Sequence, residues 1–247
     1  MSVSLTHEAF PSRADAAVSV EIPQLGKRGI FKIWAAAALP MAVLAWLVAP
    51  VLADRFAGEG HVPMAKALIV SLAIGMVWQF VLVATLVGRE QGTLRWSTVR
   101  EALWLRSPRS PRSGRVGGRI WLILIPLILA FTFAQELVAV VPAPEDREFA
   151  TLLESDAGKA FLDGAFGWYA LILVFFIFNT VLGEELLFRG YLLPRMNGAF
   201  GRGDWVANGL LFAGYHLHVP WAIPGTLLEM FTTAYPTKRY RSAWIGI

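Results

Sequence analysis

The sequence predicts an all-α fold, a polytopic bundle of transmembrane helices that encloses an intramembrane cavity. First, 56% of the 247 residues are hydrophobic and 16% are charged, whereas soluble domains average about 45–50% apolar and about 25% charged residues. Second, the apolar residues form runs near the roughly 20 residues that cross a hydrocarbon core as a helix. Third, most of the arginines gather between these runs, where membrane proteins carry their orientation signal.

Six apolar segments are candidate spans. The first three are long enough for a complete crossing, and the fourth continues without a helix breaker into its polar end. The last two are short and bounded by proline, and the sixth can be a re-entrant or tilted helix. In chain order the six segments are Ile33–Ala53, Ala67–Gly88, Ile120–Val141, Phe166–Leu193, Trp205–Val219 and Trp221–Tyr235.

Composition divides the chain into three parts. Residues 1–29 are polar and lack the apolar core of a signal peptide, so they are predicted to form a flexible cytoplasmic N-terminal tail. Residues 30–165 hold the N-terminal membrane spans, with a basic linker at 89–119. Residues 166–247 hold the remaining spans and the polar residues that interrupt them.

Charge in the linkers predicts the orientation. Residues 89–119 contain eight arginines and two acids, whereas residues 142–164 contain six acids and two bases. The positive-inside rule therefore places the 89–119 linker, and with it the N-terminus, in the cytoplasm of a multi-pass protein of the cell (plasma) membrane. Inside this linker, 93–105 is either a helix on the membrane surface or a short solvated helix. Residues 107–118, rich in Pro, Ser, Gly and Arg, are predicted to be disordered.

Two composition facts exclude whole classes of function. The chain has no cysteine, which excludes disulfides, a thiol nucleophile and a thiolate metal site. The formal net charge of +4 is modest, so no nucleic-acid partner is expected; the expected partners are the lipid bilayer and a membrane-associated peptide or protein.

Two adjacent glutamates interrupt the fourth apolar segment, in GEELLFRGYLLPR (183–195). Ionisable residues at membrane depth are costly and are functional hypotheses by default. Glu185 and Arg189 are four residues apart on one helix face, with the acid first, which favours an ion pair. Glu184 is rotated by about 100° from Glu185, so it can face a cavity and act as a general base.

The fifth segment contains FAGYHLHVP (212–220). Phe212 and His216 are four residues apart, so the phenyl ring can pack one turn below the imidazole. His218 is predicted to point elsewhere, toward the outer end of the span. Glu229, in the sixth segment, can line the same cavity or bond a neighbouring helix.

The combination of EELLFR (184–189) and FAGYH (212–216) resembles the motifs of the CAAX-protease and bacteriocin-processing family, also called Abi. This family of intramembrane proteases includes the Rce1-type prenyl-protein endopeptidases. The resemblance implies that residues 166–247 are a catalytic core with a cavity open to the cytoplasmic leaflet. By position, it makes Glu184 the glutamate that activates water and His216 the histidine that works with it, and it makes Glu185 and Arg189 the supporting pair.

The implied reaction is the hydrolysis of membrane-associated peptides or proteins. If the attacking water is bound to a divalent metal such as zinc, Glu184 and His216 are the candidate ligands. Two ligands do not complete the usual set of three for a catalytic zinc. The family also has a third motif, a histidine in a last span, which this sequence lacks before Ile247. The core is therefore expected to be without its last span.

Two other functions remain open at this point. One is a non-catalytic membrane scaffold or immunity protein of the same fold, which the missing third motif favours. The other is a proton-coupled transporter that uses Glu184, Glu185 and His216 as carriers, since such residues also mark ion paths. Inverted repeats would favour a transporter, and the sequence shows none.

Overall fold

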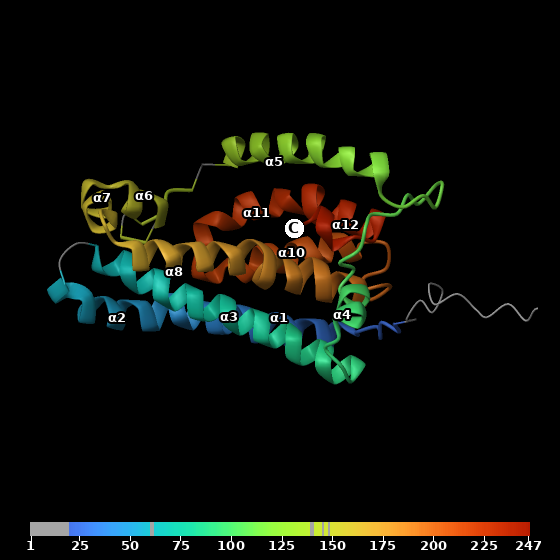
Figure 1. Ribbon diagram of the computed structural model, residues 1–247, viewed down its shortest axis with the longest axis horizontal. Coiled ribbons are helices and arrows are strands. Elements are labelled where there is room, and N and C mark those ends of the chain that lie inside the picture. The colour runs from blue at the N-terminus through green and yellow to red at the C-terminus, as the bar shows by residue number, and fades with distance from the viewer. Residues whose placement is uncertain (1–19, 60–61, 139–140, 145, 148) are drawn as a thin grey trace, which may run out of the picture.

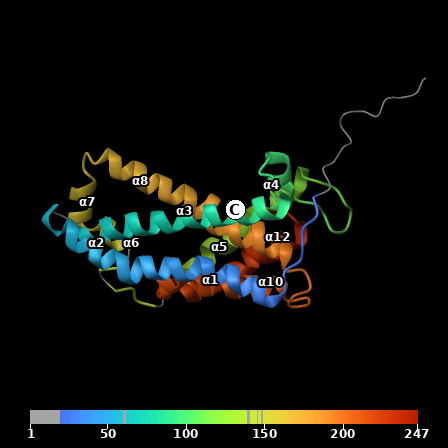
Figure 2. The same cartoon turned by 90° about the horizontal axis from the view of Figure 1, so that it is seen from below.

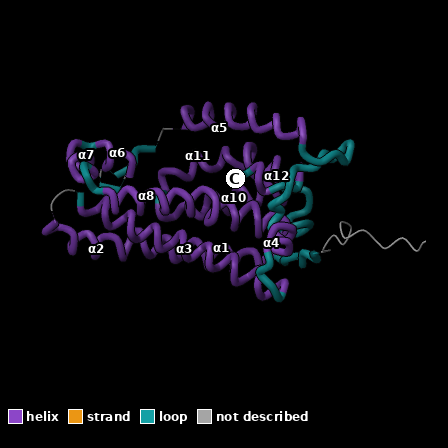
Figure 3. The backbone as a smooth tube through the Cα atoms, viewed as in Figure 1, coloured by secondary structure: helices purple, strands orange, loops and turns teal. Residues whose placement is uncertain are grey.

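The computed structural model describes residues 20–59, 62–138, 141–144, 146–147 and 149–247, and every regular element in these ranges is helical (Figures 1 and 3). Two isolated β-bridges, both in turns, are the only extended pairings among these residues. The all-α prediction is therefore confirmed for the described part of the chain.

The N-terminal part folds into two long apolar helices. The first comprises α1 (Lys27–Val43), a π-helical turn at 44–48 and α2 (Ala49–Phe56), and the second is α3 (Pro63–Gln91). Lys27–Phe56 is 30 residues long with a mean hydropathy of 2.1, and α3 is 29 residues long with a mean hydropathy of 2.3. Each is long and apolar enough to cross a membrane.

The middle of the chain is more irregular. A 3₁₀ turn (118–123) leads into α5 (Leu124–Val138), which lies beside α11 (Ile223–Glu229) along one edge of the molecule (Figure 1). At one end of the long axis, α6 (Phe149–Glu154) is followed by α7 (Asp156–Leu162). A bend of 104° separates α7 from α8 (Phe166–Ile177), and this pair is a third membrane-capable segment only if it is taken as one broken span.

The C-terminal part carries the polar motifs. α8 continues through π-helical segments at 178–183 and 186–192 to α9 (Leu193–Arg195), so the chain is helical from Phe166 to Arg195. α10 (Asp204–Tyr215) ends earlier than the predicted fifth span, and a 3₁₀ turn follows at 216–218. After α11, a π-helical segment at 230–234 leads into α12 (Tyr235–Tyr240).

The core lies where α3 meets its neighbours. α3 runs between the α1–α2 helix and α8 (Figure 2), and it also contacts the π-helical segment that follows α8. The apolar core is continuous from α1 through α3 to residues 186–192 and α10, and its largest fully buried apolar members are Ile30, Met41, Met76, Leu103, Leu187, Phe188, Leu192 and Tyr215.

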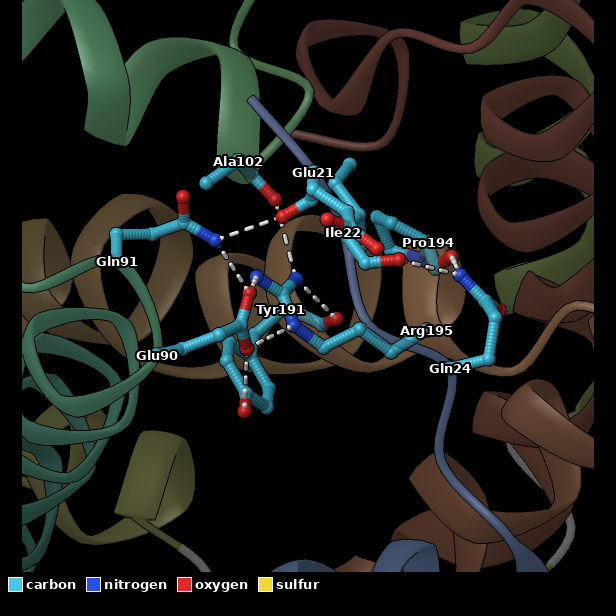
Figure 4. A network of polar contacts seen from close by, with 9 residues as sticks. All are labelled: Glu21, Ile22, Gln24, Glu90, Gln91, Ala102, Tyr191, Pro194 and Arg195. Carbon is cyan, nitrogen blue, oxygen red and sulfur yellow. Dashed lines mark hydrogen bonds and ion pairs between the residues drawn. The ribbon is translucent and has the colours of Figure 1, made fainter. Parts of the chain in front are cut away.

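An ion pair fastens several segments at the end of the molecule opposite α6 and α7. Arg195 is fully buried and contacts Glu90 twice, with Nε to Oε2 at 2.8 Å and Nη2 to Oε1 at 2.6 Å. Its Nη1 donates to the carbonyl oxygens of Ala102 at 3.0 Å and Tyr191 at 2.9 Å (Figure 4). The ion pair therefore joins the end of α3 and α4 (Trp96–Ala102) to the end of the motif-bearing helix.

The described part of the predicted N-terminal tail contacts the rest of the chain through hydrogen bonds. Residues 1–19 lie outside the described residues, but α1 begins at Lys27 and the residues before it are anchored. The N–H of Leu25 donates to the carbonyl of Arg195 at 2.8 Å. The side chain of Gln91 donates to the carbonyl of Glu21 at 2.9 Å (Figure 4). The backbone of residues 21–25 is therefore hydrogen-bonded to residues 91 and 195, which composition does not reveal.

The predicted disorder of residues 107–118 is wrong. These residues form a closed turn in which Ser110 N–H donates to Arg115 O and Gly117 N–H donates to Pro108 O. A hydrogen-bonded seam then joins the linker to the C-terminal segment, with bonds from Arg109 N–H to Tyr240 O and from the Ala243 N–H to the carbonyl of residue 104. Backbone pairing with a distant segment orders this stretch despite its composition.

Candidate active site

The two glutamates of the first motif lie between two π-helical segments. Residues 178–183 precede Glu184 and residues 186–192 follow Glu185. π-helical turns inside α-helices occur frequently at functional sites. The first of them ends at Gly183, where an added Cβ would overlap the carbonyl oxygen of Phe178, so this turn requires glycine immediately before the glutamates.

Glu185 forms the ion pair expected from its spacing to Arg189. The Nη1 of Arg189 lies 3.0 Å from Oε1 of Glu185, and the guanidinium is fully buried. Nη2 of Arg189 donates to the hydroxyl of Thr233 at 2.5 Å, and that hydroxyl donates to the carbonyl of Glu229. Arg189 thus links the motif-bearing helix to the segment after α11.

Glu184 faces the second motif. Its Oε2 lies 4.0 Å from Nε2 of His216, and both residues are less than one-tenth exposed. Nδ1 of His216 lies 2.9 Å from the carbonyl oxygen of Phe212. Because a carbonyl oxygen only accepts, Nδ1 carries the proton, which leaves the lone pair of Nε2 directed toward Glu184.

Phe212 connects the two motifs by packing. The guanidinium carbon of Arg189 lies 3.9 Å from the centre of the Phe212 ring, a cation–π contact. The same ring meets His216 edge-on, with centres 4.9 Å apart and an interplanar angle of 87°. One phenyl ring therefore fixes the positions of both the arginine and the histidine.

Tyr215 and Gln79 also belong to the site, and sequence reasoning missed both. The Gln79 amide donates to the Tyr215 hydroxyl at 2.6 Å, and that hydroxyl in turn interacts with Glu184. Tyr215 is fully buried, as is Gln79. A lone amide in the apolar segment 67–88 was the available signal for Gln79, since buried polar groups in membrane helices seek partners.

His218 lies closer to the site than predicted. It is 7% exposed, and its ring stacks on His216 with centres 5.5 Å apart and an interplanar angle of 22°. The expectation that it points elsewhere assumed that an α-helix continues through it. α10 instead ends at Tyr215 and the chain continues as a 3₁₀ turn, which brings the two imidazoles together.

Glu184, Glu185 and His216 line a cavity of about 490 Å³. Glu184, Glu185 and His216 form one wall and α5 contributes another. Glu229 also lines the cavity. Of its two predicted roles, lining the cavity is therefore favoured over bonding a neighbouring helix. The remaining lining residues are Leu124, Leu127, Ile128, Phe131, Phe212, Thr232, Thr233 and residues 244–247.

The C-terminal segment lies directly against the ion pair. A Cβ added to Gly246 would come within 2.9 Å of Cγ of Arg189 and 3.2 Å of Oε2 of Glu185. Residues 244–247, which line the cavity, therefore pack closely against the Glu185–Arg189 pair. A residue larger than glycine at position 246 would displace its neighbours.

The donor set does not fit a catalytic zinc site. Glu184 and His216 supply two ligands, and within the described residues no group of three or more His, Cys, Asp or Glu side chains is placed to hold a metal ion. Catalytic zinc usually takes three protein ligands.

Comparison with known proteins finds one family that is similar to the C-terminal third of the chain. Residues 166–247 match a family model described as type II CAAX prenyl endopeptidase Rce1-like. No curated protein and no solved structure has significant similarity to the chain. The matched region contains both motifs, and together with the apolar helices the match identifies a membrane protein. Residues 166–247 of this chain are therefore similar to the Rce1-like type II CAAX prenyl endopeptidases, as the two motifs led us to expect.

Proposed function

We propose that this protein is an intramembrane endopeptidase that hydrolyses membrane-associated peptides or proteins with a water activated by Glu184. The observation that carries the proposal is the 4.0 Å separation of Glu184 Oε2 and His216 Nε2 on the wall of one cavity. One water between these two atoms could donate a hydrogen bond to each of them. A general base must lie within hydrogen-bond reach of the proton that it removes, and this arrangement meets that requirement.

In the proposed reaction, the water oxygen attacks the carbonyl carbon of the scissile peptide bond. One water proton passes to the Glu184 carboxylate as the carbon–oxygen bond forms. His216 Nε2 accepts a hydrogen bond from the other water proton, and the contact between Nδ1 and the Phe212 carbonyl holds this orientation. Glu184 then delivers its proton to the amide nitrogen, the carbon–nitrogen bond breaks, and the products are an amine and a carboxylic acid that keeps the second water proton.

The remaining motif residues have a supporting role in this proposal. Glu185 and Arg189 neutralise one another, so a single carboxylate, that of Glu184, remains next to the histidine as the base. Arg189 also contacts Phe212 and Thr233, which ties the helix of the first motif to α10 and to the segment after α11. Loss of this pair is expected to displace Glu184 rather than remove a reacting group.

We further propose that the protein is a multi-pass protein of the cell (plasma) membrane with its basic end in the cytoplasm. The arginine-rich linker, residues 20–26, Arg195 and the C-terminal seam lie at one end of the molecule. The acidic 142–164 stretch includes α6 and α7 at the other end. This distribution supports the orientation given by the positive-inside rule.

The function is tested by cleavage of a quenched membrane peptide by the purified chain in detergent. Glu184→Gln and His216→Asn should each lower the rate by about 10²–10⁴, as expected for loss of a general base or its partner. The matched control is Glu154→Gln, which makes the same change at an exposed position in α6 and should cleave at the unaltered rate. Absence of cleavage by the unaltered chain, or equal rates for Glu184→Gln and Glu154→Gln, would contradict the proposal and favour a non-catalytic protein.

A further inference from the structure

A basic hollow lies at the arginine-rich end, outside the candidate active site. Its volume is about 500 Å³. We refer to it as the arginine hollow, and its lining residues are Arg100, Glu101, Arg106, Ser107, Arg109, Val116 and Arg241.

Three separate segments build the arginine hollow. α4 contributes Arg100, the linker turn contributes Arg109, and the residue that follows α12 is Arg241. The seam holds these segments together, because Arg106 Nε donates to the carbonyl of Arg241 at 3.2 Å and Ser242 Oγ donates to the carbonyl of Arg106 at 2.6 Å. The hollow is therefore part of the fold.

The charge of the arginine hollow is strongly unbalanced. Glu101 is its only acidic lining residue, and it pairs with Arg106 at 3.0 Å and Arg100 at 3.4 Å. Four guanidinium groups thus face one carboxylate, which leaves a formal excess of three positive charges. Arginine clusters of this kind recognise phosphate, since the planar guanidinium donates two hydrogen bonds to one anion.

An apolar groove begins beside the arginine hollow. Val99 lines the groove and the next residue, Arg100, lines the hollow; Leu105 and Arg106 repeat this relation six residues later. The groove has a volume of about 320 Å³. Trp96, which also lines it, is 62% exposed.

From this juxtaposition we propose that the protein binds one anionic phospholipid molecule, with its phosphate in the arginine hollow and an acyl chain in the adjoining groove. A phosphate group complements the excess positive charge, and a hydrocarbon chain complements the groove. A soluble anion would leave the groove unused. Basic pockets at the cytoplasmic side of membrane proteins are suited to anionic headgroups, and the exposed Trp96 suits a position at the membrane interface.

The lipid site also adjoins the candidate active site. Trp244 and Ile247 line both the apolar groove and the cavity that contains Glu184. A bound lipid would therefore contact the wall formed by residues 244–247. The proposal itself concerns binding alone and does not rest on peptide hydrolysis, so its failure can be distinguished from failure of the proposed function.

The test measures lipid retention by the purified full chain in detergent, using native mass spectrometry with added dioleoyl phosphatidylglycerol or dioleoyl phosphatidylcholine. We expect one tightly retained phosphatidylglycerol and no retained phosphatidylcholine. The variant Arg109→Gln/Arg241→Gln removes two cations from the arginine hollow and should weaken phosphatidylglycerol binding roughly 10- to 30-fold, at about fivefold for each arginine.

A matched control separates a built site from general charge attraction. Arg112→Gln/Arg115→Gln removes the same charge, from exposed positions in the linker turn that do not line the hollow, and should retain phosphatidylglycerol as the unaltered chain does. Equal losses for the two double variants would overturn the proposal.

Two further measurements test the two halves of the site. Trp96→Ala should weaken phosphatidylglycerol binding, and inorganic phosphate at millimolar concentration should compete poorly with the lipid. Full competition by inorganic phosphate, together with no effect of Trp96→Ala, would show a phosphate site without a lipid. Displacement of the lipid by an acidic peptide alone would show a protein-binding surface and would equally contradict the proposal.

Discussion

Glu184 and Glu185 are adjacent in the sequence but have different surroundings. Glu185 forms an ion pair with the buried Arg189, and Gly246 packs against both. Glu184 instead faces His216 and Tyr215. The contrast assigns a structural task to one carboxylate and the proposed chemical task to the other.

The two glutamates should therefore respond differently to the same substitution. Glu185→Gln leaves the fully buried Arg189 without its charged partner, and breaking a buried pair in this way costs about 3–5 kcal/mol. Glu184→Gln should unfold at nearly the same temperature as the unaltered chain while losing activity. Thermal unfolding in detergent measures the difference. Equal melting of the two variants would contradict the division of tasks, and Glu185→Gln/Arg189→Gln should recover part of the lost stability.

Tyr215→Phe tests whether the hydroxyl positions Glu184. Losing a hydrogen bond to a charged group costs about 1.5–3 kcal/mol, so kcat should fall roughly 10- to 100-fold with KM little changed. The substitution also removes the acceptor of the Gln79 amide. Gln79→Leu/Tyr215→Phe removes both partners and should restore stability without restoring kcat. If the Tyr215 hydroxyl had a purely structural role, the double variant would recover both stability and kcat.

Two contacts among these residues could be predicted from their spacing along one helix. The Glu185–Arg189 pair and the Phe212–His216 contact both follow from a four-residue separation. The contact between Gln79 and Tyr215 joins residues that are 136 positions apart, and no local periodicity encodes such a distance. The stacking of His218 on His216 was missed because it depends on where α10 ends.

At the scale of elements, apolar length predicted the first two long helices well. The predicted segments Ile33–Ala53 and Ala67–Gly88 lie within the helices Lys27–Phe56 and Pro63–Gln91. The π-helical segments around Glu184 and Glu185 were not predicted, because they arise from packing against neighbouring helices and not from composition. The short fifth and sixth segments divide into several turns for the same reason.

Asp204 fastens the turn before α10 to α12. Its carboxylate accepts hydrogen bonds from the N–H groups of Gly198 at 3.0 Å and Phe200 at 2.8 Å, and from Lys238 at 2.5 Å. Burial alone raises the pKa of Asp204, but these hydrogen bonds and the charge of Lys238 outweigh it and hold the pKa below its ordinary value. The residue precedes the proposed span that begins at Trp205.

This lowered pKa predicts how stability depends on pH. A carboxyl whose pKa is lower in the folded state stabilises the protein fully above its unfolded pKa, about 3.9, and loses that contribution as the pH falls through the folded pKa. The unaltered chain should therefore lose stability in acid below about pH 4. Asp204→Asn should be less stable at pH 7 and should vary less with pH in that range. The measurement is the melting temperature of both proteins between pH 7 and pH 3. If it falls by the same amount in both proteins, Asp204 makes no such contribution.

For the whole molecule, charge patterning anticipated which segments share one end. The N-terminal residues 20–26, the basic linker, Arg195 and residues 240–243 meet there through hydrogen bonds. The order of the 107–118 turn was not anticipated, because it depends on a seam with residues that follow more than 120 positions later. Composition describes the intrinsic tendency of such a stretch and not the partner that orders it.

The proposed orientation can be tested with single cysteines, since the chain has none of its own. Ser113 lies in the exposed linker turn and Ala160 is exposed in α7, near the opposite end. Ser113→Cys should resist an impermeant thiol reagent in intact cells and react after the membrane is permeabilised, whereas Ala160→Cys should react in both states. The reverse pattern would invert the topology, and reaction of both variants in intact cells would exclude the multi-pass arrangement.

The central claim is that Glu184 and His216 act together on one water molecule. The most direct test is the rate of membrane-peptide cleavage by Glu184→Gln, His216→Asn and the double variant, measured under single-turnover conditions. Residues that act as a unit give strongly non-additive losses, so the double variant should be no slower than the slower single variant. If the logarithms of the two single losses add up in the double variant, the two residues act independently and the account is contradicted.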